Sequence, residues 1–244
     1  MSRLLLSLPR RLFLVTILAG AALIAWASVD YFDFSILPAF VIEKMPLRFE
    51  SLYLACLRVH VATALPSLPL CLLLTTRVLQ RRQKLHRWLG RVTGVLLLFA
   101  LVPSGIVLSF SAKGGGIVTL GFLLSAAIVA CCTVWGIRAA RRRELVAHGR
   151  AMRHVVAQMS VAVTSRALMI GLDTLGVSPE LGYVLALWVP VLGSAAVVEL
   201  LSMGSSNLFS KFLRTVERIR RENVSLHLLL RTRSVARPVP RVSR

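Results

Sequence analysis

The sequence predicts an all-α protein: a polytopic bundle of about six transmembrane helices with both termini in the cytoplasm. Three observations predict this fold class. The chain is 56% hydrophobic with a mean hydropathy of +0.74, only 16% of its residues are charged, and six long apolar runs alternate with loops of contrasting charge. A soluble domain of this length is nearer half apolar and a quarter charged. The composition therefore excludes an ordinary soluble domain.

Each apolar run is long enough to cross a bilayer, whose hydrocarbon core of about 30 Å needs roughly 20 helical residues. Within lipid, every backbone N–H and C=O must be bonded inside the segment, so runs of this length fold as helices. They define a first helix within residues 1–30 and a helix bundle over residues 31–206. The predicted spans are residues 12–29, 52–76, 88–110, 117–139, 152–172 and 181–203.

The charge of the loops orients the bundle. Arginine and lysine are concentrated in the N-terminus, residues 77–91, residues 138–153 and the C-terminal tail. The segments between them are acidic or nearly uncharged. Because basic loops stay in the cytoplasm, both termini are predicted to lie there, and an even number of spans agrees with this orientation.

The net charge of +20 is mostly this cytoplasmic belt. It predicts that the partners are the lipid bilayer and anionic phospholipids at its cytoplasmic face. A basic soluble protein of this charge would instead suggest nucleic acid, and we expect no nucleic-acid partner here. The absence of organelle signals and four cysteines that all fall within predicted spans favour the inner (plasma) membrane of a bacterium.

Two segments at the ends of the chain need separate interpretation. Residues 1–28 combine a basic start, an apolar stretch and the triplet Ala25-Trp26-Ala27, so a cleaved signal peptide is the alternative to a retained first helix. Residues 207–220 repeat apolar residues at helical spacing with basic residues between them, which predicts an amphipathic helix on the cytoplasmic membrane face. The rest of the basic tail, to residue 244, is predicted to be disordered.

Ionisable side chains within a span are costly and are therefore candidates for function. Arg58 and His60 lie in the second predicted span, and Arg166 lies in the fifth. At about 1.5 Å of rise per residue, all three fall in one layer of the outer half of the membrane, roughly 9 to 12 Å deep. This layer predicts either a pocket for an anion or arginines that extend to the outer interface, with His60 bonded to a neighbouring carbonyl.

The other histidines gather at the cytoplasmic side. His86 precedes the third span, and His148 and His154 flank the start of the fifth. Neutral imidazole is a strong ligand for haem iron, and two histidines on facing helices at one depth would hold haem b. The candidate haem ligands are thus His86, His148, His154 and His60, although histidines beside arginines are also common at a solvated interface.

Motifs of soluble enzymes are missing from the chain. It contains no Gly-rich phosphate loop ending in Lys-Ser/Thr, no G-x-S-x-G, no H-E-x-x-H and no paired carboxylates. We therefore predict no catalytic residue and no metal site. The cysteines contain no C-x-x-C pair, and we interpret them as packing residues: Cys56, Cys71, Cys131 and Cys132.

The polar residues as a set resemble a known family. Arg58-Val59-His60, Leu85-His86-Arg87 with Gly90-Arg91, His148-x-x-x-Met152 and the later Arg166 resemble the predicted membrane proteins known as domain of unknown function 2306, over about residues 50–200. The resemblance implies a multi-helix bacterial inner-membrane protein without an established activity. It marks as motif positions His60, His86, Arg87, Gly90, Arg91, His148, Met152 and Arg166.

This chain departs from the family pattern at two positions. Ala151 stands where the family usually has Trp, and His154 stands where it usually has Arg. Three interpretations of function remain open: a multi-pass protein of unassigned, structural role; a haem b-binding redox protein; and a transporter of a small solute or anion that uses Arg58, His60 and Arg166.

Overall fold

The computed structural model describes residues 8–33, 39–42, 44–47 and 49–204, and every regular element in these ranges is helical. Five helices are long and apolar enough to cross a membrane, and a sixth apolar helix, Leu12–Ala27, is shorter. The predicted all-α polytopic bundle is therefore confirmed. The five spans are Glu50–Leu74, Gln83–Ser109, Gly115–Arg141, Leu145–Thr174 and Pro179–Ser202.

All five helices begin earlier than the sequence predicts, and for two of them the difference exceeds two residues. The third predicted span starts at residue 88, but the helix starts at Gln83; the fifth starts at residue 152, but the helix starts at Leu145. The apolar runs measure only the part suited to lipid, whereas lysine and arginine are good helix formers and let the helix continue beyond it. His86 and His148 consequently lie within regular helix rather than in loops.

The chain begins with three helical elements: α2 (Leu8–Ala27), the 3₁₀ turn η1 (Val29–Phe32) and the short α3 (Ala39–Ile42). Helix α2 packs against α4 (Glu50–Leu74) and α9 (Leu145–Thr174). Ile17 is buried in the main core, and Gly20 allows the side chain of Val163 to approach α2 closely. The predicted amphipathic helix at 207–220 and the remaining tail lie outside the described residues.

A single long helix contains a π-helical turn. It comprises α6 (Gln83–Leu96), the π-turn η2 (Leu97–Leu101) and α7 (Val102–Ser109), and it follows the short α5 (Arg77–Arg81). Pro103 follows the π-turn; it has no N–H, and its ring would clash with the carbonyl four residues earlier in a regular helix. A wider turn is one of the local adjustments that accommodate proline inside a membrane helix.

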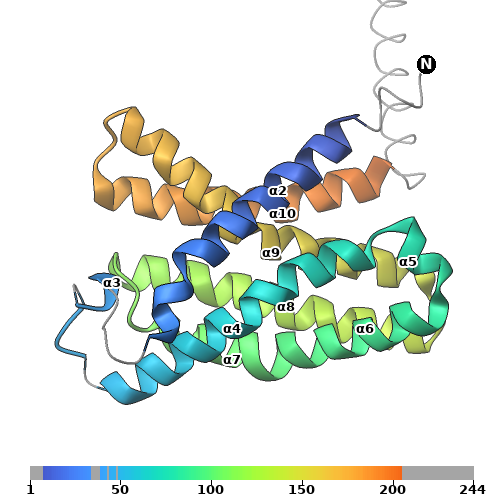
Figure 1. The fold of residues 1–244 in the computed structure, drawn as a ribbon. Helices are drawn as coiled ribbons and strands as arrows, with labels where there is room; N and C mark the ends of the chain where they lie inside the picture. The colour runs from blue at the N-terminus through green and yellow to red at the C-terminus, as the bar shows by residue number, and fades with distance from the viewer. Residues whose placement is uncertain (1–7, 34–38, 43, 48, 205–244) are drawn as a thin grey trace, which may run out of the picture. The chain divides into compact units, whose positions relative to one another are not determined.

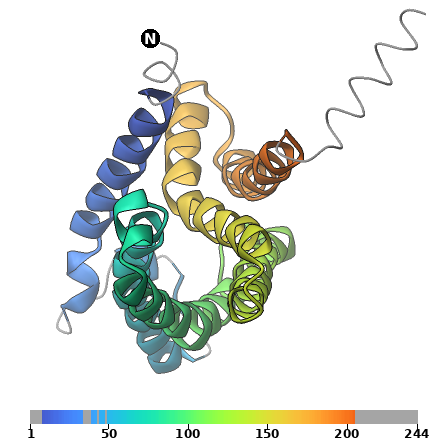
Figure 2. The ribbon, with the colours of Figure 1, turned by 90° about the vertical axis from the view of Figure 1, so that its right-hand side faces the viewer.

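Helices α8 (Gly115–Arg141) and α9 form the most extensive helix pair, and they lie side by side with α7 next to α8 and α4 next to α7 (Figures 1 and 2). Their connection is a tight reversal. Glu144 N–H donates to the Ala139 carbonyl at 2.9 Å, and Arg143 N–H donates to the Ala140 carbonyl at 3.1 Å. Arg143 has φ 62°, the left-handed conformation that ends a helix in this way.

Among the described residues, the compact unit formed by the bundle ends at Val198. Within this unit, α10 (Pro179–Gly204) packs on α8 and α9 through a small apolar cluster. The indole N–H of Trp188 donates to the Ile117 carbonyl at 3.1 Å. The cluster consists of the buried residues Val118, Val161, Leu187 and Val191.

The main core lies where α2, α4, η2, α8 and α9 meet. It is built almost wholly from aliphatic side chains and methionine, which suits packing between membrane helices. Its buried members are Ile17, Leu68, Cys71, Leu72, Leu97, Leu101, Val129, Val155, Met159 and Val163. All four cysteines are free thiols; Cys71 is buried in this core, whereas Cys131 is exposed and does not fit the interpretation as a packing residue.

One buried amide connects three helices. Gln158 on α9 is only 4% exposed. Its Oε1 accepts a hydrogen bond from Ser125 Oγ of α8 at 2.9 Å. Its Nε2 donates to the Val191 carbonyl at 2.9 Å and to Ser194 Oγ at 3.0 Å, both on α10. The side chain thus uses both ends to fix the relative positions of α8, α9 and α10.

Replacing Gly121 with leucine should destabilise the bundle by about 1–3 kcal/mol, because a Cβ there would lie 2.7 Å from Leu187 Cδ2 and 3.3 Å from Trp188 Cε2. The free energy of unfolding, measured by SDS titration in mixed micelles, checks this. Gly193→Leu is the matched control, since nothing lies within 4 Å of its Cβ position. Equal losses in both variants would contradict close packing at Gly121.

Gln158→Leu keeps the side-chain volume but removes the three hydrogen bonds, and it should cost about 1–2 kcal/mol of unfolding free energy. The same SDS titration measures it. Gln80→Leu, at an exposed position whose amide only reaches a nearby backbone carbonyl, serves as the control and should change stability by less than about 0.5 kcal/mol. A Gln158→Leu protein as stable as the control would show that the network does not hold the helices.

Candidate functional site

The best-defined histidine is His148, in the first turns of α9. Its Nδ1 lies 2.9 Å from the Gly136 carbonyl on α8. A carbonyl only accepts hydrogen bonds, so Nδ1 carries a proton, and Nε2 is the ring nitrogen whose lone pair can ligate a metal. A hydrogen bond from the far ring nitrogen to a backbone carbonyl is the usual arrangement for a histidine that ligates a metal.

His86, on the first turns of α6, is the neighbour of His148. The two rings are close enough for their charges to interact. Nδ1 of His86 is buried and makes no hydrogen bond with any residue that the structure describes. Leaving such an atom unsatisfied costs about 1–3 kcal/mol, so it calls for an explanation in a folded protein. His86 and His148, on two different helices, thus lie within range of an electrostatic interaction.

Other ligating groups do not gather around this pair. Over residues 8–33, 39–42, 44–47 and 49–204, no three histidine, cysteine, aspartate or glutamate side chains are placed to hold a metal ion. A zinc site needs at least three protein ligands. Two imidazoles are sufficient for haem iron, because the porphyrin supplies the other four nitrogens.

His154, the third cytoplasmic candidate, is buried and differs in position from His148. It lies six residues further along α9, which places it about 120° around the helix. The electrostatic interaction described for His86 is with His148, and His154 is not named in it. His154 is engaged in an interaction of its own.

Gly136 is a site residue that the sequence analysis missed. It accepts the hydrogen bond of His148, and a Cβ at its position would collide with the methyl group of Met152. Ala151, fully buried, lies 3.3 Å from the same Cβ position. Two family-like motif residues, His148 and Met152, therefore meet at one glycine on α8. A glycine inside an apolar helix was the available signal, since such a position often marks close packing.

The motif residues that remain to be described near His86 lie on α6. Arg87 and Arg91 are exposed, and Arg87 Nε donates to the Gln83 carbonyl of its own helix at 3.3 Å. Gly90 has nothing within 4 Å of its Cβ position. Both arginines thus add positive charge to the exposed surface of α6 near its N-terminal end.

His60 is the intramembrane histidine of α4. Its Nδ1 lies 3.2 Å from both the Leu101 carbonyl and Ser104 Oγ. The Ser104 hydroxyl donates to the Ala100 carbonyl at 2.6 Å, so towards His60 it accepts, and Nδ1 again carries the proton. Gly105 lies against the ring, with its Cβ position 3.0 Å from Cε1. His60 therefore connects α4 to the π-turn and α7, through a carbonyl as the sequence analysis expected.

The two arginines of the outer layer are held by different neighbours. Arg58 Nε donates to the Tyr31 carbonyl in η1 at 3.2 Å. Arg166 is exposed, and its Nη1 donates to the Ala162 carbonyl of its own helix at 2.7 Å. The hydrogen bonds of Arg58, His60 and Arg166 thus lead to three separate places, and none of them joins two members of the layer.

Lysines from two loops add positive charge near this end. Lys44 donates to the Tyr53 hydroxyl at 3.0 Å. Partial burial, and then the charge of Lys113, lower the pKa of Lys44 from its usual value. Tyr183 of α10 lies within electrostatic range of Lys113 and Arg166. The sequence analysis did not single out these lysines, because a charged residue in a loop is ordinarily solvated.

The comparisons with known proteins agree with the fold. A family model described as "Predicted membrane protein (DUF2306)" matches residues 57–202, more than half of the chain. No curated protein and no solved structure matches the chain. The matched residues include His60, His86, His148, Met152 and Arg166. The chain therefore belongs to the DUF2306 family of predicted membrane proteins.

Proposed function

We propose that this multi-pass membrane protein binds haem b, with His86 of α6 and His148 of α9 as the axial ligands. The proposal is carried by one observation: the buried Nδ1 of His86 has no hydrogen-bond partner in the described part of the chain, and the ring lies within electrostatic range of His148. The orientation of His148 supports the same conclusion, since its bond to Gly136 leaves Nε2 as the ligating nitrogen.

The surroundings of the pair suit haem better than a bare metal ion. Haem b is an anion through its two propionates, and arginine binds carboxylates in a bidentate manner. We infer that the propionates would pair with Arg87 and Arg91 of α6 and with Arg138 near the end of α8. His60 and His154 are left outside the proposed haem site.

Bound haem supplies one-electron transfer, and ligation by two histidines leaves no open position on the iron for oxygen. The protein's own part is to fix the two rings from separate helices and to surround the group with apolar helix faces. The proposed activity is therefore electron transfer within the membrane rather than oxygen chemistry or hydrolysis.

We also propose the location and orientation of the chain from its charge pattern. The basic segments 77–91 and 138–153 mark the cytoplasmic surface of the inner membrane, where the helices meet anionic phospholipids, with both termini on the same side. A cytoplasmic N-terminus requires that α2 is retained and crosses the membrane. The burial of Ile17 in the main core supports retention of α2 rather than its cleavage as a signal peptide.

Purified in detergent after expression with haem supplied, the protein should show a Soret band that shifts on reduction with dithionite, with split visible bands in the reduced form. His86→Ala and His148→Ala should lose most of the bound haem, because each removes one axial ligand. His60→Ala is the matched control and should keep the spectrum, since it removes an intramembrane histidine outside the proposed site.

Size-exclusion chromatography and circular dichroism establish that each variant is folded, and added imidazole should partly restore the spectrum of His148→Ala. A featureless spectrum from folded wild-type protein would contradict the proposal. The transport interpretation, centred on Arg58, His60 and Arg166, would then be tested by Arg166→Ala in vesicles, and loss of solute movement with folding intact would support it. Loss of stability without any ligand would support a structural role.

A further inference from the structure

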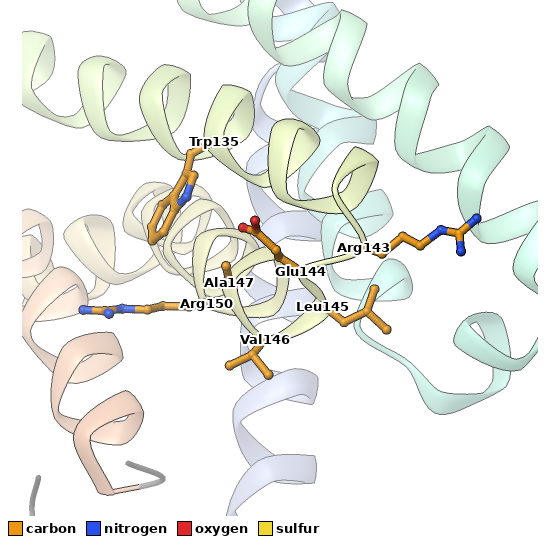
Figure 3. Close-up of a pocket in the computed structure, with 7 residues that line it drawn as sticks. All are labelled: Trp135, Arg143, Glu144, Leu145, Val146, Ala147 and Arg150. Carbon is orange, nitrogen blue, oxygen red and sulfur yellow. The ribbon is translucent and has the colours of Figure 1, made fainter. Parts of the chain in front are cut away.

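A shallow depression of about 550 Å³ lies between the end of α8 and the first turns of α9 (Figure 3). It is separate from the histidine pair and is open to the surroundings of the protein. Its lining residues include one aromatic ring, one carboxylate and two guanidinium groups. These residues are Trp135, Arg143, Glu144, Leu145, Val146, Ala147 and Arg150.

The depression lies at the level where a membrane helix meets the lipid headgroups. Trp135 is 43% exposed and comes three residues before Arg138, which begins the basic end of α8. Tryptophan and arginine together at the end of a span are typical of this interface. Leu145 and Val146 are 73% and 87% exposed, so apolar side chains also face outward at the start of α9. Lipid is the surrounding that suits this combination.

Glu144 is the unusual member of the set. It is the one acidic residue between Glu50 and Asp173, and it stands within the most arginine-rich part of the described chain. Its side chain does not cap α9, and it makes no hydrogen bond or ion pair with any residue in the described ranges. Figure 3 shows its carboxylate on the same side of α9 as Trp135. Neither helix capping nor a salt bridge therefore accounts for its presence.

The groups around the depression complement a headgroup with two opposite charges. A carboxylate and an indole ring that line one depression suit an ammonium ion, through a charge-assisted hydrogen bond and a cation–π contact. Arg150, which extends below Trp135 in Figure 3, suits a phosphate. Arg143 extends in the opposite direction in the same view, so its guanidinium group lies away from Trp135.

We propose that this depression binds the headgroup of phosphatidylethanolamine. The ammonium group would lie between Glu144 and the Trp135 ring, the phosphate would pair with Arg150, and the acyl chains would pass the exposed Leu145 and Val146. An anionic lipid such as phosphatidylglycerol fits less well, because its headgroup has no ammonium group to pair with Glu144 and its net negative charge is not offset within the headgroup.

The experiment is native mass spectrometry of the full-length protein, delipidated in detergent and titrated with phosphatidylethanolamine or phosphatidylglycerol. Wild-type protein should retain phosphatidylethanolamine more tightly at the first bound-lipid step. Glu144→Gln should weaken that step about tenfold, the loss expected for one charge-assisted hydrogen bond, while binding of phosphatidylglycerol stays the same or rises. Arg150→Gln should weaken both lipids.

Arg143→Gln is the matched control. It removes a guanidinium group from the same turn, but the Arg143 side chain extends away from Trp135, so both lipids should bind to this variant as they do to wild type. Circular dichroism and thermal unfolding show that each variant is folded. Two results would overturn the proposal: tighter binding of phosphatidylglycerol by wild-type protein, or equal loss of phosphatidylethanolamine in Glu144→Gln and Arg143→Gln. The outcome is independent of haem binding, since both lipids are compared in one preparation.

Discussion

The structure depends on one constraint: within lipid, a polar group must find its partner inside the protein. Nearly every polar side chain of the spans meets this need through a backbone carbonyl. His60 bonds to Leu101, His148 to Gly136 and Trp188 to Ile117, each on a different helix from its own. Gln158 does the same and adds two serine hydroxyls. These bonds, together with apolar packing, set which helix faces meet.

The orphaned nitrogen of His86 is significant against this background. In a molecule whose intramembrane hydrogen-bonding groups are otherwise so consistently paired, the two buried side-chain atoms without partners in the described ranges are His86 Nδ1 and Thr133 Oγ1. A hydroxyl can reorient towards its own helix at little cost, whereas an imidazole nitrogen is fixed by its ring. The histidine therefore carries the stronger indication of a missing ligand.

The sequence was sufficient to predict where the membrane helices lie, but it was not sufficient to predict which residues of different helices are in contact. Apolar runs of about 20 residues predicted the spans, because lipid imposes length and composition on each helix separately. Which residues meet depends on how helices rotate against one another, and neither Gln158 nor Gly136 stands out by charge or motif. Conversely, Arg58, His60 and Arg166 share a predicted depth, yet their hydrogen bonds lead to different elements, because depth does not determine the direction in which a side chain points.

The π-turn at Leu97–Leu101 affects how the two halves of its helix, α6 and α7, are rotated relative to each other. Its hydrogen bonds span five residues instead of four, so it holds one residue more than an α-helical turn. Without that residue, α7 would be rotated by about 100° relative to α6. His86 lies on one side of this turn, and the Ser104 and Gly105 that contact His60 lie on the other. The extra residue therefore sets the rotational phase of the helix, so that α6 and α7 both pack on α4 while α7 also packs on α8.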